Sequence, residues 1–273
     1  MIRNILVHVD VSKRSQMRVE CAVQLARSMD ARVDGVFVFP PAPISAYLAG
    51  AGDGAAAAHV VQEAMREAQI HCDQRRSAFE AAVGTVGGAW FEADGPVVKM
   101  LCEHAYRYDL VVLGQHDYAI GEASLFSSTE GVVLESGRPV LIIPEVTARP
   151  SVATQVLIAW TPSREATRSV HDAMPLLRNA GSVVLVTFNA DEARSSSGPA
   201  MVAHLGAHGV NATHRNLECD DDVGKALLSC AAEHESDLIV MGAYGHSRLR
   251  ELVFGGATRD VLKNMDVPVL MSN

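Results

Sequence analysis

Short apolar runs alternate with longer amphipathic segments along the whole chain. The first run, Asn4–Val9 (NILVHV), is almost continuously apolar, as expected of a strand buried on both faces. In Ser15–Met29 apolar side chains recur four residues apart, which predicts a helix. The same reasoning predicts strands at 32–39, 89–93, 109–114 and 139–144, and helices at 56–83, 96–108 and 129–136. This order predicts a parallel sheet with helices on both faces.

The second half of the chain repeats the order of the first. Residues 155–177 (QVLIAWTPSREATRSVHDAMPLL) correspond to residues 4–26 in their pattern of apolar positions. In the same way, Asp237–Gly242 (DLIVMG) corresponds to Asp109–Gly114 (DLVVLG). Such self-similarity indicates a tandem duplication. We place repeat one at 1–147 and repeat two at 148–273, and each is expected to form a doubly wound α/β unit.

Composition narrows the class of protein. The 273 residues are 48% hydrophobic and 20% charged, and the net charge of −9 argues against a nucleic-acid binder that works through phosphate attraction. The N-terminus passes straight into a strand, and no apolar run reaches the ~20 residues of a spanning helix, so we expect a cytoplasmic protein without a membrane partner. The five cysteines form no C-x-x-C pair, which favours free thiols.

Glycines gather near the C-terminus, in LIVMGAYGHSRLRELVFGGATRDVL. Gly242 and Gly245 follow a predicted strand, and Gly255 and Gly256 precede a predicted helix. Glycine tolerates positive φ and lets backbone N–H groups approach an anion, and a helix N-terminus favours phosphate. Arg248 adds positive charge. The stretch therefore predicts a phosphate site at the carboxyl edge of the sheet, against the alternative that the glycines only shape turns.

The same stretch resembles the nucleotide loop of the universal stress proteins, G-x2-G-x9-G-[ST]. Gly242, Gly245 and Gly255 fit the pattern, whereas Gly256 stands where that family has Ser or Thr. NILVHVDVSKRS, DLIVMG and VPVLMS also resemble strands of that family, so the likeness covers nearly the whole chain. It implies a tandem universal stress protein with two five-stranded parallel sheets of order 3-2-1-4-5, similar to the adenine-nucleotide α-hydrolases.

The resemblance further implies an ATP or AMP site in repeat two, with or without Mg²⁺. Phosphates would lie on the glycine loop, Phe188 beside the adenine, and Thr161 near the ribose and metal, where the family has Asp. The residues assigned to this site are Thr161, Phe188, Gly242, Gly245, His246, Arg248, Gly255, Gly256 and Ala257.

Repeat one departs from the pattern in its corresponding loop, GQHDYAIGEASLFSS. It keeps the strand-one carboxylate, Asp10, but of the three glycines only Gly114 survives. Asp117 replaces the second glycine and Ser127 the third. Because a carboxylate repels phosphate, repeat one is expected not to hold ATP in the family manner.

Three functions remain open on the sequence. The first is a nucleotide-dependent sensor or adaptor in a stress response, as the resemblance implies. The second is a nucleotide-free scaffold, an internal pseudo-dimer in which repeat one binds a protein partner or small molecule under residues 40–58, a Pro/Gly/Ala-rich segment expected to be mobile. The third is an enzyme, at most a slow ATPase, because we find no P-loop lysine, no evident general base and no catalytic residue to assign. A homodimer is an alternative assembly, and no metal-ligand spacing stands out.

Overall fold

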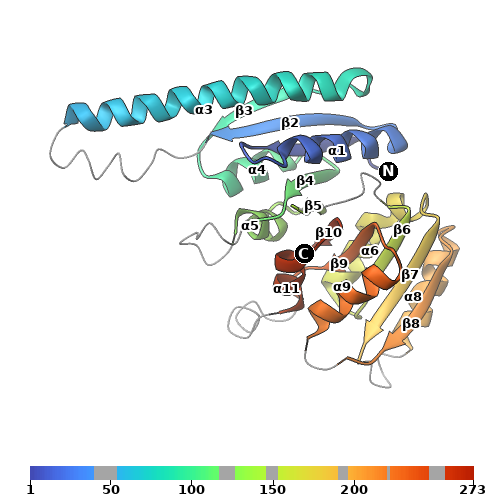
Figure 1. The fold of residues 1–273 in the computed structure, drawn as a ribbon. Coiled ribbons are helices and arrows are strands. Elements are labelled where there is room, and N and C mark those ends of the chain that lie inside the picture. Colours follow the sequence, from blue (N-terminus) through green and yellow to red (C-terminus); the bar gives the residue numbers. More distant parts are fainter. Residues whose placement is uncertain (40–53, 117–126, 146–152, 190–195, 220–221, 246–255) are drawn as a thin grey trace.

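The computed structural model describes residues 1–39, 54–116, 127–145, 153–189, 196–219, 222–245 and 256–273, and it has the expected doubly wound α/β fold (Figure 1). The strands of repeat one are β1 (Asn4–Val9), β2 (Arg32–Phe39), β3 (Trp90–Asp94), β4 (Leu110–Gly114) and β5 (Val140–Ile143). Its helices are α1 (Ser15–Met29), α3 (Gly54–Val83), the 3-10 helix η1 (Gly84–Val86), α4 (Val97–Ala105) and α5 (Ser128–Glu135).

Repeat two follows the same order of elements. Its strands are β6 (Gln155–Ala159), β7 (Ser182–Phe188), β8 (Ala212–Leu217), β9 (Leu238–Gly242) and β10 (Val269–Ser272). Its helices are α6 (Arg164–Leu177), α8 (Ser197–Ala207), α9 (Val223–Glu233) and α11 (Ala257–Asn264). None of the helices in the described ranges combines the length and apolar character needed to cross a bilayer.

The strands of both repeats form one sheet instead of two separate ones. Its order is β3-β2-β1-β4-β5-β10-β9-β6-β7-β8, so each repeat contributes five strands in the order 3-2-1-4-5 counted within that repeat. Neighbours within a repeat run parallel, whereas β5 and β10 pair antiparallel, with Leu141 opposite Leu270. The repeats therefore join edge to edge, and each covers a strand edge of the other.

The alternation of side chains along each strand builds two core layers. Ile5 and Val7 of β1 point to the layer under α1, α3, α6 and α8, whereas Leu6 points to the layer under α4, α5, α9 and α11. All three side chains are fully buried. The second layer contains side chains of both repeats, so the core is continuous across the junction.

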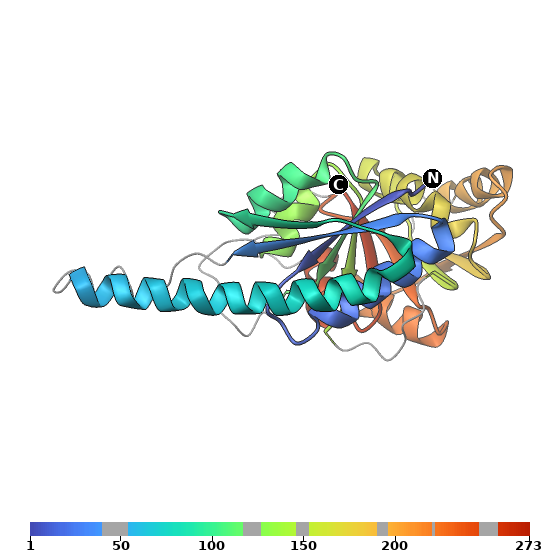
Figure 2. The ribbon, with the colours of Figure 1, turned by 90° about the horizontal axis from the view of Figure 1, so that it is seen from above.

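Helix α3 is the largest difference between the repeats. It begins at Gly54, so residues 54–58 of the segment expected to be mobile are helical, and 40–53 lie outside the described residues. The C-terminal end packs through Phe79, which is fully buried, whereas Met65 is 63% and Ile70 48% exposed. Figure 2 shows that the N-terminal part of α3 projects beyond the sheet.

Candidate functional site

The described members of the predicted site lie at the carboxyl edge of repeat two. Phe188 ends β7 and Gly242 ends β9, and both strands flank β6 in the parallel sheet. Thr161 is exposed just beyond β6, and its carbonyl accepts a hydrogen bond from the Ser163 N–H at 2.7 Å. Gly256 is the N-cap residue of α11, and Ala257 is its first residue. His246, Arg248 and Gly255 lie outside the described residues.

The described glycines at this edge allow other groups to pack close to the backbone, and none of them adopts the left-handed conformation. A Cβ on Gly242 would lie 2.5 Å from the backbone nitrogen of Ala166, so Gly242 is needed where the start of α6 packs against the end of β9. Gly245 and Gly256 have no φ in the left-handed region either, and Gly256 is extended at φ −123°. Of the two properties of glycine on which the sequence prediction rests, these three positions therefore do not use the tolerance of positive φ. The residue that adopts it is Tyr244, at φ 58°.

A carboxylate that sequence reasoning missed lies beside Gly245. Glu165 is in the first turn of α6, is 9% exposed, and would have its Oε2 atom 3.1 Å from a Cβ at position 245. Its Oε1 atom accepts a hydrogen bond from Arg164 Nε at 3.0 Å. The negative charge of Glu165 is thus partly balanced by Arg164, and Gly245 has a packing reason of its own.

The helix that follows the fourth strand begins differently in the two repeats. In repeat one, Ser127 caps α5: its Oγ atom accepts from the Glu130 N–H at 3.2 Å, while Glu130 Oε2 accepts from the Ser127 N–H at 2.7 Å. In repeat two, Gly256 caps α11 and supplies no side-chain hydrogen bond. Ser127 and Gly256 hold the same N-cap position, so Ser127 corresponds to Gly256. The prediction from the sequence that Ser127 replaces the third glycine of the pattern, Gly255, is corrected by the structure.

The presence of this cap at α5 and its absence at α11 affect how well each helix N-terminus can bind an anion. Glu130 is only 2% exposed, so repeat one places a buried carboxylate at the N-terminus where an anion would otherwise lie. The equivalent residue of repeat two is Arg259, which is exposed, and Asp260 adds one acidic group to the same turn. The pattern S-x-x-E at Ser127–Glu130 was readable in the sequence as a capping box.

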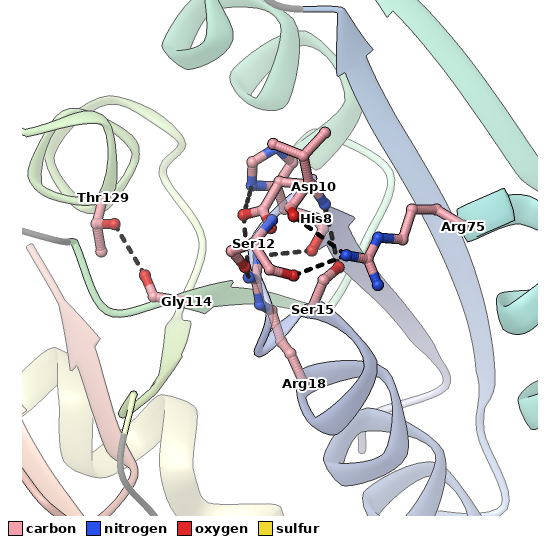
Figure 3. Close-up of polar contacts among 9 residues, drawn as sticks. His8, Asp10, Ser12, Ser15, Arg18, Arg75, Gly114 and Thr129 are labelled. Atoms are coloured by element: carbon pink, nitrogen blue, oxygen red, sulfur yellow. Dashed lines mark hydrogen bonds and ion pairs between the residues drawn. The ribbon is translucent and has the colours of Figure 1, made fainter. Parts of the chain in front are cut away.

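A buried arginine fills the end of β1 in repeat one (Figure 3). Arg18 is 3% exposed; its Nη1 donates to the His8 carbonyl at 2.8 Å and its Nη2 to Asp10 Oδ2 at 3.0 Å. A Cβ on Gly114 would lie 2.8 Å from Nη2, so Gly114 leaves room for the guanidinium. Repeat two has Ser169 where repeat one has Arg18. The Asp10 carboxylate is therefore bound by an arginine of the same repeat, for which repeat two has no counterpart.

Burial and charge set the protonation of this cluster. Burial opposes ionisation of Asp10, but the positive charge of Arg18 and hydrogen bonds from Ser12 and Arg18 outweigh it, so the pKa of Asp10 lies below its usual range. Burial is also the main cause that lowers the pKa of His8 to about 4, and the charge of Arg18 acts in the same direction against that of Asp10. At neutral pH the cluster thus holds one ion pair and a neutral imidazole.

Helix α3 holds the loop that carries this cluster. Arg75 Nη2 donates to the carbonyls of Val11 at 3.1 Å and Ser12 at 3.0 Å (Figure 3). Within the described ranges no group of three or more His, Cys, Asp or Glu side chains is placed to hold a metal ion. At the carboxyl edge of repeat one, protein groups thus bind the Asp10 carboxylate and the loop after β1.

The fold and the two carboxyl edges define a two-repeat doubly wound α/β protein in which side chains cap the start of α5 and no side chain caps the start of α11. The universal stress protein family matches residues 1–144 and again 153–273, so the chain belongs to this family and carries its domain twice. The resemblance seen in the sequence is thereby confirmed.

Known proteins support the same assignment. The universal stress protein Slr1230 of Synechocystis is 27% identical over 173 residues, which cover 60% of this chain and 57% of that relative, so the alignment spans little more than half the relative's length. A universal stress protein from Archaeoglobus fulgidus DSM 4304 is similar in structure, with a TM-score of 0.74, 20% identity and coverage of 99% of this chain and 96% of that one. The functionally unknown protein PA1789 of Pseudomonas aeruginosa PAO1 has a TM-score of 0.56 at 15% identity, with coverage of 100% and 92%. These two likenesses concern the fold.

Proposed function

We propose that repeat two binds an adenine nucleotide, ATP or AMP, and that the protein acts as a nucleotide-dependent sensor or adaptor in a stress response. One observation carries the proposal: α11 starts at Gly256 without a side-chain cap, whereas the matching start of α5 is filled by Glu130. An uncapped helix N-terminus has free N–H groups and a positive dipole end, both of which favour phosphate.

The other parts of the site follow from the strand ends. Phe188, half-buried at the end of β7, offers a ring edge or face to a base, and Thr161 offers an exposed hydroxyl to a ribose or to a metal-bound water. A nucleotide lying across the ends of β6 and β7 with its phosphates toward α11 would meet both. Mg²⁺ would reduce the repulsion between the phosphates and Glu165.

Titration calorimetry with ATP and with AMP tests the proposal. We expect one site per chain, because repeat one carries the Glu130 carboxylate at its helix start and the Arg18–Asp10 pair at the end of β1. Two equivalent sites would contradict the interpretation that repeat one is closed. The absence of heat with both nucleotides, with and without Mg²⁺, would refute the proposed function.

One observation favours a second candidate, the nucleotide-free scaffold. Gly242 is explained by the packing of α6, and the carboxylate of Glu165 lies beside Gly245, so these two glycines need no ligand to account for them. Mass spectrometry of the native protein, purified without added nucleotide, separates the candidates. Co-purified AMP or ATP would exclude the scaffold. Any hydrolysis of ATP is expected to be slow, because the sequence has no P-loop lysine.

A further inference from the structure

Tyr244 links the glycine loop of repeat two to repeat one. It stands between Gly242 and Gly245, is 7% exposed, and donates its hydroxyl hydrogen to Glu130 Oε1 at 2.5 Å. Glu130 lies 114 residues earlier in the chain, at the start of α5. A short hydrogen bond from a neutral hydroxyl to a buried carboxylate is among the stronger polar contacts in a protein.

The acceptor is fixed by its own repeat. Glu130 Oε2 accepts from the Ser127 N–H at 2.7 Å, which leaves Oε1 directed at the junction between the repeats. The carboxylate cannot swing away from Tyr244 without breaking the cap of α5. Repeat one thus presents a rigid acceptor to the loop of repeat two.

The backbone of Tyr244 needs such support. Its φ of 58° lies in the left-handed region, which costs a residue with a bulky side chain about 1 kcal/mol or more. A glycine would adopt this conformation without that cost, but the neighbouring glycine, Gly245, does not. The Tyr244 N–H donates to Thr258 Oγ1 at 3.3 Å, in the first turn of α11. Tyr244 is therefore tied both to α11, where we place the phosphates, and to α5 of the other repeat.

We infer that Tyr244 is a positioning residue for the nucleotide site and that repeat one acts as its intramolecular support through Glu130. The inference rests on the proposed function of repeat two. The Glu130 carboxylate that caps α5 in repeat one also holds Tyr244, whose N–H is bonded to the first turn of α11. Repeat one then contributes to nucleotide affinity without binding a nucleotide.

The test compares two Tyr→Phe variants that each remove one buried hydroxyl. Tyr244→Phe removes the contact with Glu130, and Tyr108→Phe removes the matched bond from the Tyr108 hydroxyl to Asp34 Oδ2 (2.7 Å), which lies within repeat one. Calorimetry with ATP and AMP is run with thermal unfolding of the unliganded variants. We expect Tyr244→Phe to weaken nucleotide binding about tenfold and Tyr108→Phe to leave it unchanged, with similar losses of thermal stability.

Glu130→Gln is the second variant, because glutamine also completes a capping box and α5 should stay folded. We expect it to weaken binding by a smaller factor, and the double variant with Tyr244→Phe to bind no more weakly than Tyr244→Phe alone. If wild type binds and Tyr244→Phe binds equally well, the inference is wrong and the proposed function stands. Equal losses in Tyr244→Phe and Tyr108→Phe would make the effect one of general stability and overturn the inference. If wild type binds no nucleotide, both proposals fail.

Discussion

Copying the side-chain cap of α5 onto α11 should weaken nucleotide binding while it raises the free energy of unfolding. The change is Gly256→Ser together with Arg259→Glu, which places at α11 the pair that Ser127 and Glu130 form at α5. Gly256 has extended backbone, so serine there adds no backbone strain, and Arg259 is exposed, so glutamate there can point into solvent. A completed cap adds from a few tenths to about 1 kcal/mol to the free energy of unfolding.

Binding should move in the opposite direction. Arg259→Glu changes the local charge by two units; for a phosphate about 6 Å away at an effective dielectric constant of about 20, each unit contributes about 3 kcal/mol. Because Arg259 is exposed, salt screening removes about half of the total. The remaining ~3 kcal/mol predicts a loss of about a hundredfold in ATP affinity, and a smaller loss for AMP, which carries less charge.

The assay is calorimetric titration with ATP beside urea unfolding of the unliganded protein. Lys263→Glu is the charge-matched control, because it makes the same change in net charge at the exposed far end of α11. That control should bind ATP within about threefold of wild type, since the last turn lies roughly a Debye length from the first. A capped variant that is stable and still binds ATP with wild-type affinity would show that the start of α11 does not hold phosphate.

Three further predictions concern stability. Arg18→Met leaves the half-buried carboxylate of Asp10 without its cation and should lower the free energy of unfolding by about 2 kcal/mol in a urea titration, less than for a fully buried pair because solvent reaches Asp10; a loss below about 1 kcal/mol would mean that the pair is not needed. The pKa of His8 falls from 6.5 to about 4 on folding, so between these values the unfolded chain takes up a proton that the folded chain refuses; stability should drop by up to about 3 kcal/mol as the pH falls from 6.5 to 4, and His8→Ala, which copies Ala159 of repeat two, should flatten this dependence. Phe79→Ala should cost about 3 kcal/mol because the buried ring anchors α3 on the sheet, and unchanged unfolding would show that α3 is anchored elsewhere.

Much of the fold was readable because periodicity is a local signal. The bounds predicted for β1 and α1 agree with the structure, since apolar side chains at strand spacing and then at helix spacing mark both elements. The junction of β5 and β10 was not predicted. Both strands are short apolar runs, and which edges meet depends on the whole surface of each repeat and not on either run.

The candidate site was readable in part. Glycines mark where backbones come close, but the sequence does not say what comes close, and at Gly242 it is the start of α6. Arg18 lies in an amphipathic helix, where the pattern predicts that a polar residue is exposed, but it is buried and donates to Asp10. The bond between Tyr244 and Glu130 joins positions 114 residues apart, and no local pattern records it.

The two repeats differ most in where their charges find partners. In repeat one the carboxylate of Asp10 is matched by Arg18, and the dipole of α5 is matched by Glu130, so neither of these two is left for a ligand to satisfy. Repeat two has Thr161 and Arg259 at the positions of Asp10 and Glu130, and its α11 start lacks a side-chain cap. We expect that restoring glycines to the loop of repeat one would not by itself create a site, because Asp10, Arg18 and Glu130 lie outside the glycine stretch. Under the proposed function, the lack of a site in one repeat and the support of the site in the other would share one group, because the carboxylate that caps α5 is also the acceptor of the Tyr244 hydroxyl.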